Sequence, residues 1–96
     1  MAAVRYTERA LADVERLTEF LAGSDPGASL DTAKIIFEAV DILRRHPQIG
    51  RPGEDDFREL IISRGETGYV ALYSYEEGEE VVIVHAIRHQ REAGYD

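Results

Sequence analysis

Apolar residues recur at intervals of three and four along two segments of the chain, a spacing that places them on one face of an α-helix. The first segment covers residues 8–22 and follows Thr7, a residue type that favours a helix N-cap. The second covers residues 30–46, with Ser29 as its expected cap and Pro47 as its end. The apolar stripes consist of Leu11, Val14, Leu17 and Leu21 in the first segment and Ala33, Ile36, Phe37, Val40 and Leu43 in the second. Because the turn formers of residues 23–27 lie between them, the pattern predicts a hairpin of two amphipathic helices.

Shorter apolar runs typical of β-strands occupy other parts of the chain. Residues 3–6 alternate and predict a short first strand. Residues 57–63, 69–75 and 81–87 are rich in β-branched and aromatic side chains, and short segments with glycine separate them. They predict an antiparallel meander of three strands, followed by a charged tail over residues 88–96. The expected fold is α+β in the order β-α-α-β-β-β, with the helical hairpin packed on a small antiparallel sheet, as one domain over residues 1–96.

Three tyrosines, Tyr69, Tyr73 and Tyr75, have odd numbers in the middle strand of this meander. In a regular strand they point to the same face of the sheet. Core packing with the hydroxyl groups at the rim is the favoured interpretation. A platform on which nucleic-acid bases stack is the alternative, and the acidic surroundings argue against it.

Composition narrows the class of protein. The chain has 96 residues, no cysteine and a formal net charge of −8. It therefore has no disulfide, no thiolate nucleophile and no zinc site with cysteine ligands. The apolar runs are shorter than a membrane span needs, and the first residues lack the pattern of a secretory signal, so we expect a cytoplasmic protein that binds no membrane. The negative charge opposes binding to nucleic acid, which depends on cations that neutralise phosphates.

Most motifs that hold cofactors or catalyse reactions are absent from the chain, so we expect no cofactor and no catalytic residue. His85 and His89 are four residues apart, but they lie in and just after a predicted strand, where this spacing does not form a metal pair. We interpret His85 as a packed strand residue and expect no metal site. Arg58 and Arg64 flank the first strand of the meander, where we expect them to pair with nearby carboxylates such as Glu59.

The tail gathers groups of another kind: Arg88, His89, Arg91 and Tyr95. Such groups can stabilise a phosphate and transfer protons in RNA cleavage. They can equally anchor a protein partner, since arginine and tyrosine are favoured at interface hot spots. A solvated terminus without a function is the third interpretation.

The order of these elements resembles the RelE/ParE superfamily of type II toxin-antitoxin toxins, and more closely its ParE-like branch of plasmid stabilisation proteins. Residues 6–13 are similar to the opening Y-T-x-x-A-x-x-D segment of the family, and Leu43, Pro47 and Gly50 to its L-x-x-x-P-x-x-G corner. The further similar segments are residues 57–60, Gly68-Tyr69 with Tyr73, and residues 84–92. The resemblance covers nearly the whole chain.

This resemblance implies a bacterial toxin that a cognate antitoxin neutralises, with a C-terminal antitoxin segment that folds onto the toxin in a hetero-oligomer. RelE-like members cleave mRNA on the ribosome, whereas ParE-like members inhibit DNA gyrase without an established hydrolytic site. Compared with RelE, the chain has Val70 and His89 in place of two arginines, while Tyr95 falls near the terminal tyrosine. The basic cluster before the meander is replaced by residues 54–56, which are all acidic.

The broken set of cationic groups favours gyrase inhibition by protein contact over RNA cleavage, and direct binding of nucleic acid is not expected. Ribosome-dependent mRNA cleavage and a non-toxic binding module of the same fold are the alternatives. The antitoxin has two candidate surfaces, the outer side of the helical hairpin and the sheet near the tail. The residues expected to bind partners are Arg58, Arg64, Arg88, His89, Arg91 and Tyr95.

Overall fold

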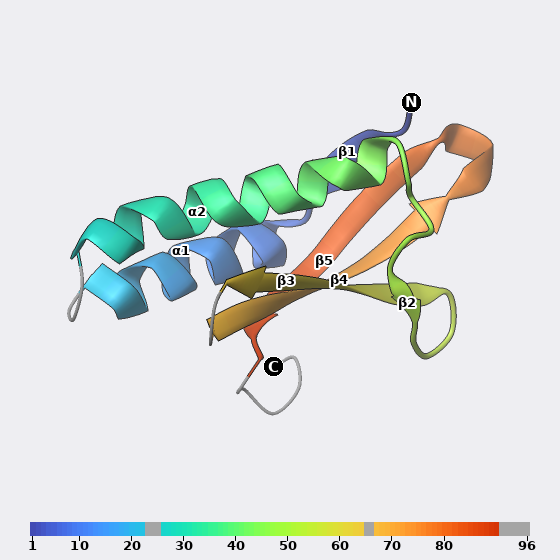
Figure 1. The fold of residues 1–96 in the computed structure, drawn as a ribbon. Coiled ribbons are helices and arrows are strands. Elements are labelled where there is room, and N and C mark those ends of the chain that lie inside the picture. The colour runs from blue at the N-terminus through green and yellow to red at the C-terminus, as the bar shows by residue number, and fades with distance from the viewer. Residues whose placement is uncertain (23–25, 65–66, 91–96) are drawn as a thin grey trace.

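The computed structural model describes residues 1–22, 26–64 and 67–90 and places two helices on one face of a twisted sheet (Figure 1). The helices are α1 (Glu8–Ala22) and α2 (Pro26–Val40), and a 3₁₀ turn (Asp41–Arg44) continues α2. The strands are β1 (Ala3–Tyr6), β2 (Arg51–Pro52), β3 (Phe57–Arg64), β4 (Thr67–Glu76) and β5 (Val81–His89). The predicted α+β class, with a helical hairpin and a three-stranded meander, is confirmed.

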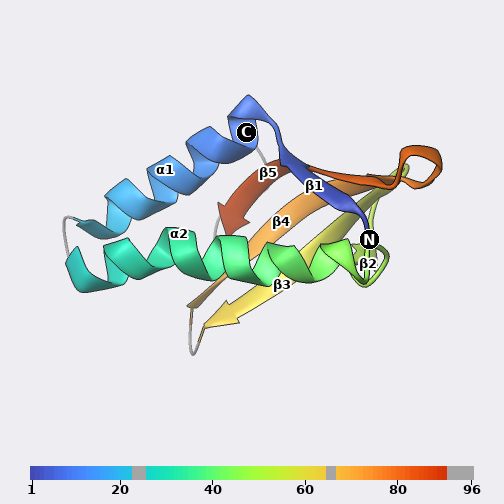
Figure 2. The same ribbon diagram turned by 90° about the horizontal axis from the view of Figure 1, so that it is seen from above.

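The sheet has the strand order β1-β5-β4-β3-β2 and is mixed. The meander β3-β4-β5 is antiparallel as expected, but β1 runs parallel to β5, with Ala3 opposite Val81. The parallel pairing follows from the helical hairpin, which carries the chain from β1 to the far edge before the meander returns. The sheet also contains the two-residue β2, which the sequence pattern did not indicate. From above, α1 and α2 diverge from the end where they are connected, and β1 lies at the wide end (Figure 2).

The start of α1 agrees with the sequence, whereas the bounds of α2 differ from those predicted. Thr7 caps α1, because its Oγ1 accepts a hydrogen bond of 3.0 Å from the amide of Ala10. The same hydroxyl donates to the carbonyl of His85 over 3.0 Å and so connects the helix to β5. α2 begins at Pro26 rather than at residue 30, since proline fits the first turn, where its missing N–H is not needed. The predicted turn at 23–27 lies outside the described residues over 23–25.

The predicted second helix extended to His46, but the α-helix ends at Val40. The 3₁₀ turn from Asp41 to Arg44 replaces its last part, and the amide of His46 still donates to the carbonyl of Ile42 over 3.0 Å. A tighter last turn is a common way for a helix to satisfy its final carbonyls. Within the described residues, no helix is long and apolar enough to cross a membrane.

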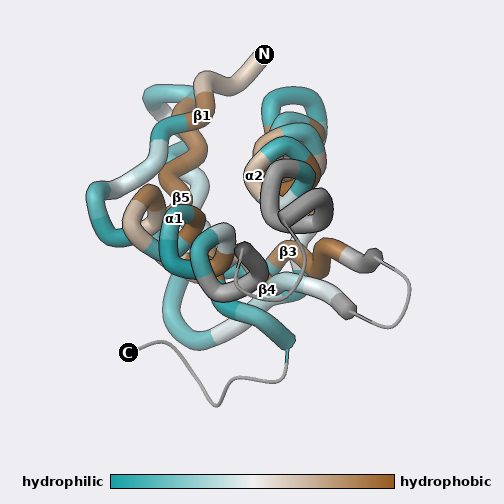
Figure 3. The backbone as a smooth tube through the Cα atoms, turned by 90° about the vertical axis from the view of Figure 1, so that its left-hand side faces the viewer, coloured by the Kyte–Doolittle hydropathy of each residue, from teal (hydrophilic) through white to brown (hydrophobic). Residues whose placement is uncertain are grey.

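The core lies between the helices and the sheet. Val14 and Leu17 of α1 and Ile36 and Val40 of α2 are buried against the strands, as their helical spacing predicted. Apolar stretches of β3 and β5, brown in Figure 3, lie close to the two helices. The buried sheet residues of this cluster are Ile62, Tyr69, Ala71, Tyr73, Val82, Val84 and Ile87, and Tyr75 packs partly against it. The core interpretation of the three tyrosines is therefore confirmed.

A β-bulge interrupts the pairing of β4 with β5. Leu72 is in register with Ala86 and Tyr73 with Val84, so that His85 has no partner in β4. An extra residue in one strand exchanges the two faces for every residue that follows it. Val84 and Ile87, which are three residues apart, therefore both belong to the helix-side core.

Candidate functional site

The described residues that we expected to bind partners lie at two ends of the sheet and do not form one cluster. Arg58 is in register with Tyr73 near the start of β3, and Arg88 and His89 lie at the end of β5. Arg64 ends β3, about 20 Å from Arg58 by strand geometry, and its side chain is not among those described. Arg91 and Tyr95 lie outside the described residues.

Arg58 does not form the expected ion pair with a carboxylate. Its Nη1 donates to the carbonyl of Gln48 over 3.1 Å and to that of Gly50 over 2.8 Å. Glu59, one of the carboxylates expected to pair with it, instead binds Arg51 of β2 with an N–O distance of 3.1 Å. The loop before β2 offers carbonyls closer to the guanidinium, and Arg58 therefore holds this loop against the sheet.

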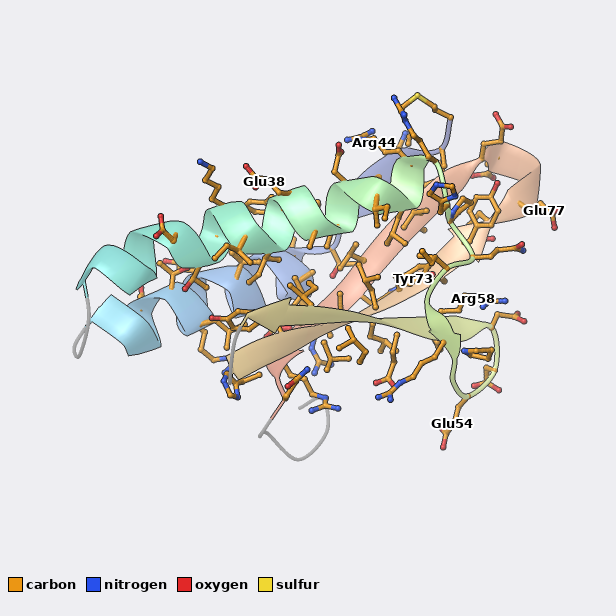
Figure 4. All side chains as sticks on the ribbon, in the orientation of Figure 1. Glu38, Arg44, Glu54, Arg58, Tyr73 and Glu77 are labelled. Carbon is orange, nitrogen blue, oxygen red and sulfur yellow. The ribbon has the colours of Figure 1, made fainter. Side chains whose placement is uncertain are left out.

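Tyr73, in register with Arg58, holds the same loop. Its phenol oxygen accepts a hydrogen bond of 2.8 Å from the amide of Gly50, and its side chain is fully buried. Burial raises the pKa of Tyr73, while this hydrogen bond and Arg58 act in the opposite direction. A Cβ on Gly50 would lie 2.6 Å from the tyrosine hydroxyl and 2.9 Å from the carbonyl oxygen of Glu59, which explains a glycine at this corner. Figure 4 shows Tyr73 beside this loop.

At the other end of the sheet, Arg88 and His89 follow the bulge, which decides that Arg88 faces away from the helices and His89 toward them. Arg88 is in register with Val70 on the face away from the helices, and its Nη1 donates to the carbonyl of His89 over 3.2 Å. His89 is in register with Tyr69, and the two rings meet edge to face with centroids 5.8 Å apart. In the alignment with RelE, Val70 and His89 stand at the positions of two arginines that belong to one cationic site. The structure places them on opposite faces, so that a site beside Val70 contains Arg88 and not His89.

The sequence did not predict that Arg88 lies beside Val70 in place of His89, because a bulge has no local signal in the pattern of apolar and polar residues. Val70 is 2% exposed and Ala86 1% exposed, although both belong to the face without helices. This face therefore has an apolar centre beside Arg88. Among the described residues, no group of three histidine, aspartate or glutamate side chains is arranged to hold a metal ion.

His85 is the extra residue of the bulge and packs on the face of the sheet without helices. This agrees with its interpretation from the sequence as a packed strand residue. Its Nε2 and the hydroxyl of Ser74 are 2.8 Å apart, and its ring meets that of Phe57 edge to face at 5.1 Å. Burial lowers the pKa of His85 from its ordinary value of 6.5, while the carboxylate of Glu76 acts in the opposite direction. The neutral imidazole is therefore the form that the fold favours.

The protein is expected to lose stability as the pH falls, with His85 as one cause. Because its pKa is lower in the folded state than in the unfolded state, its contribution is fully present above pH 6.5 and is lost as the pH falls through the folded pKa. Urea unfolding across this range should show a weaker pH dependence for His85→Gln than for the original chain. His46→Gln, at an exposed position, is the matched control and should keep the original dependence. An equal pH dependence in His85→Gln would contradict the assignment.

The comparisons with known proteins agree on one family. A family model described as the ParE toxin of type II toxin-antitoxin system, parDE, matches residues 4–94. The toxin RelE3 of Caulobacter vibrioides is 30% identical over 92 residues, which cover 96% of this chain and 98% of the relative. The putative toxin Y4kP of Sinorhizobium fredii is 31% identical over 82 residues, which cover 84% of this chain and 83% of the relative.

Solved structures show the same fold. The chromosomal ParDE toxin-antitoxin system from P. aeruginosa contains a chain with a TM-score of 0.78 at 22% identity, and the match covers 91% of this chain and 94% of the other. The isolated RelE toxin of E. coli matches with a TM-score of 0.67 at 18% identity, over 97% of this chain and 88% of the other. Both kinds of toxin therefore share this architecture of two helices on a sheet.

Proposed function

Because the chain belongs to the ParE toxin family of type II toxin-antitoxin systems, we propose that it acts in the cytoplasm by inhibiting DNA gyrase through protein contact. In this proposal the chain has no catalytic residue of its own. A cognate antitoxin neutralises it, which agrees with the toxin-antitoxin systems among the similar structures.

The observation that carries the proposal is the apolar centre of the face without helices. Cleavage of RNA needs cations that stabilise the phosphate and groups that transfer protons. Val70 and Ala86 lie beside Arg88 on this face, and His89 points to the helix side. The net charge of −8 adds repulsion toward ribosomal RNA, while contact with a protein carries no such penalty.

Two assays run side by side test the proposal. Purified chain should abolish supercoiling by gyrase in the presence of ATP and cause cleaved DNA to accumulate, while translation of a reporter mRNA in a cell-free system continues. Addition of the cognate antitoxin should restore supercoiling. Supercoiling that continues at micromolar concentrations of the chain would contradict gyrase inhibition.

The same assay tests the contact between the antitoxin and the tail end of the sheet. We propose that antitoxin carboxylates bind the guanidinium groups there, among them that of Arg88. A higher concentration of antitoxin should then be required to restore supercoiling with the Arg88→Ala variant than with the original chain. A matched change to alanine of the exposed Arg5, which lies in β1 outside the helical hairpin and in register with Ile83, should leave the requirement unchanged.

Ribosome-dependent mRNA cleavage is the second candidate. The name of the relative RelE3 and the position of Arg88 beside Val70 favour it. It predicts that translation stops, that cuts in mRNA appear on the ribosome, and that Arg88→Ala reduces them. A chain that affects neither assay and does not arrest growth when it is induced without its antitoxin would instead be a non-toxic binding module.

A further inference from the structure

A cavity of about 310 Å³ lies at the end of the sheet opposite to Arg88 and His89. The loop between β2 and β3 forms one wall with Asp55 and Asp56, and the end of β4 forms another with Glu76 and Glu77. In Figure 4, Glu77, Arg58 and Glu54 follow one another from top to bottom at this end of the molecule. The cavity is therefore separate from the tail end of the sheet, where the proposed antitoxin contact lies.

The lining of the cavity has a net negative charge, because four carboxylates and one guanidinium, that of Arg58, contribute to it. The carboxylates of Asp55, Asp56, Glu76 and Glu77 are exposed, and none of them forms an ion pair within the described part of the chain. Arg58 also lines the cavity, but its Nη1 binds the carbonyls of Gln48 and Gly50. A positively charged group that enters the cavity therefore meets carboxylates without a competing internal partner.

Two aromatic residues, whose side chains belong to opposite faces of the sheet, also line the cavity. Phe57 and Tyr75 are half-buried and contribute to its walls, and the ring of Phe57 rests against the imidazole of His85 at 5.1 Å. Aromatic faces attract cations, and a guanidinium group stacks on them while its N–H groups bind carboxylates. Gln48 adds an amide side chain to the rim. A cavity that combines the ring of Phe57, an excess of carboxylates and an amide suits a flat cation better than a neutral or anionic ligand.

We propose that this cavity binds the side chain of an arginine from a protein partner. The planar guanidinium, with five N–H donors, matches a lining with the ring of Phe57 and four carboxylates better than the compact ammonium of lysine does. The inference does not depend on whether gyrase is the target, because it rests on this end of the sheet alone.

Titration of the full-length ¹⁵N-labelled chain with N-acetyl-L-arginine methylamide, followed by NMR, tests the proposal. Amide signals of Phe57 and of residues 74–77 should shift and saturate in the millimolar range. N-acetyl-L-citrulline methylamide, which is neutral and similar in shape, should cause no saturable shift. Equal responses to the two probes, or shifts spread evenly over all acidic surfaces, would overturn the proposal.

Charge-neutral variants locate the binding site. Glu76→Gln with Glu77→Gln should weaken binding of the arginine probe about fivefold or more, as expected for the loss of two exposed ion pairs. Glu15→Gln with Glu19→Gln, at exposed positions on α1, removes the same charge and should leave the affinity unchanged. Asp55→Asn with Asp56→Asn repeats the test on the opposite wall if the first variant does not fold. Equal losses in the variants of the cavity and of α1 would show a general charge effect and overturn the proposal.

Discussion

Replacing Tyr73 with alanine is expected to lower the free energy of unfolding by about 3–5 kcal/mol, the usual cost of deleting a buried aromatic side chain. Tyr73 is fully buried in the core, and it also holds the amide of Gly50 with its hydroxyl. The variant loses both the packing of the ring and the anchor of the loop before β2. Since small proteins are stable by only about 5–15 kcal/mol, much of the chain should be unfolded or degraded in the cell. Urea unfolding monitored by circular dichroism measures the loss.

The change Tyr73→Phe measures the contribution of the hydroxyl to stability apart from that of the ring. It keeps the packing but leaves the buried amide of Gly50 without its partner, which costs about 1–3 kcal/mol. Tyr75→Phe is the matched control, because the hydroxyl of the half-buried Tyr75 forms no hydrogen bond within the described part of the chain. Its stability should change by less than about 0.5 kcal/mol. Equal effects of Tyr73→Phe and Tyr75→Phe would show that the bond to Gly50 contributes nothing.

Replacing Leu43 with alanine is the second change with a large expected effect, a loss of about 2–5 kcal/mol in the free energy of unfolding. Leu43 lies in the 3₁₀ turn after α2 and is fully buried in the core. Its side chain fixes the point at which the chain leaves the helices toward Gly50. The cavity left by the change cannot be filled without movement of the neighbouring core residues.

The neighbouring residue provides the control. Ile42 belongs to the same 3₁₀ turn and is 44% exposed, so Ile42→Ala should cost less than about 1 kcal/mol. The midpoints of urea unfolding of the two variants should therefore differ clearly. If both changes cost the same, Leu43 would not be the anchor of this turn. The burial of Leu43 and the close packing of Gly50 give a physical reason for the L-x-x-x-P-x-x-G corner that the sequence contains.

Much of the architecture followed from local patterns in the sequence. The period of three to four residues located α1, and alternation with β-branched side chains located the ends of the three strands of the meander to within two residues. Thr7 marked the first cap, and the tyrosines of β4 were correctly interpreted as core. These features depend on interactions between residues close in the chain, or on which face an element buries, and both leave a periodic signal.

The site was less predictable from the sequence. The comparison with RelE placed His89 in one site with Val70, but the bulge at His85 puts Arg88 beside Val70 instead. Arg58 was expected to pair with a carboxylate and binds backbone carbonyls of the preceding loop. Both outcomes depend on segments that meet only in the folded chain, and such contacts leave no pattern in a window of neighbouring residues.

The sequence by itself determined the helical hairpin, the first strand, the three strands of the meander, and that the charge is strongly negative. Only the tertiary structure decided that β1 joins β5 in parallel, that Arg88 shares a face with Val70, and that four carboxylates surround one cavity. The physical reason is that periodicity reports the environment along one element. Register, bulges and cavities arise from the pairing of elements distant in the chain, where one extra residue exchanges the faces of a strand.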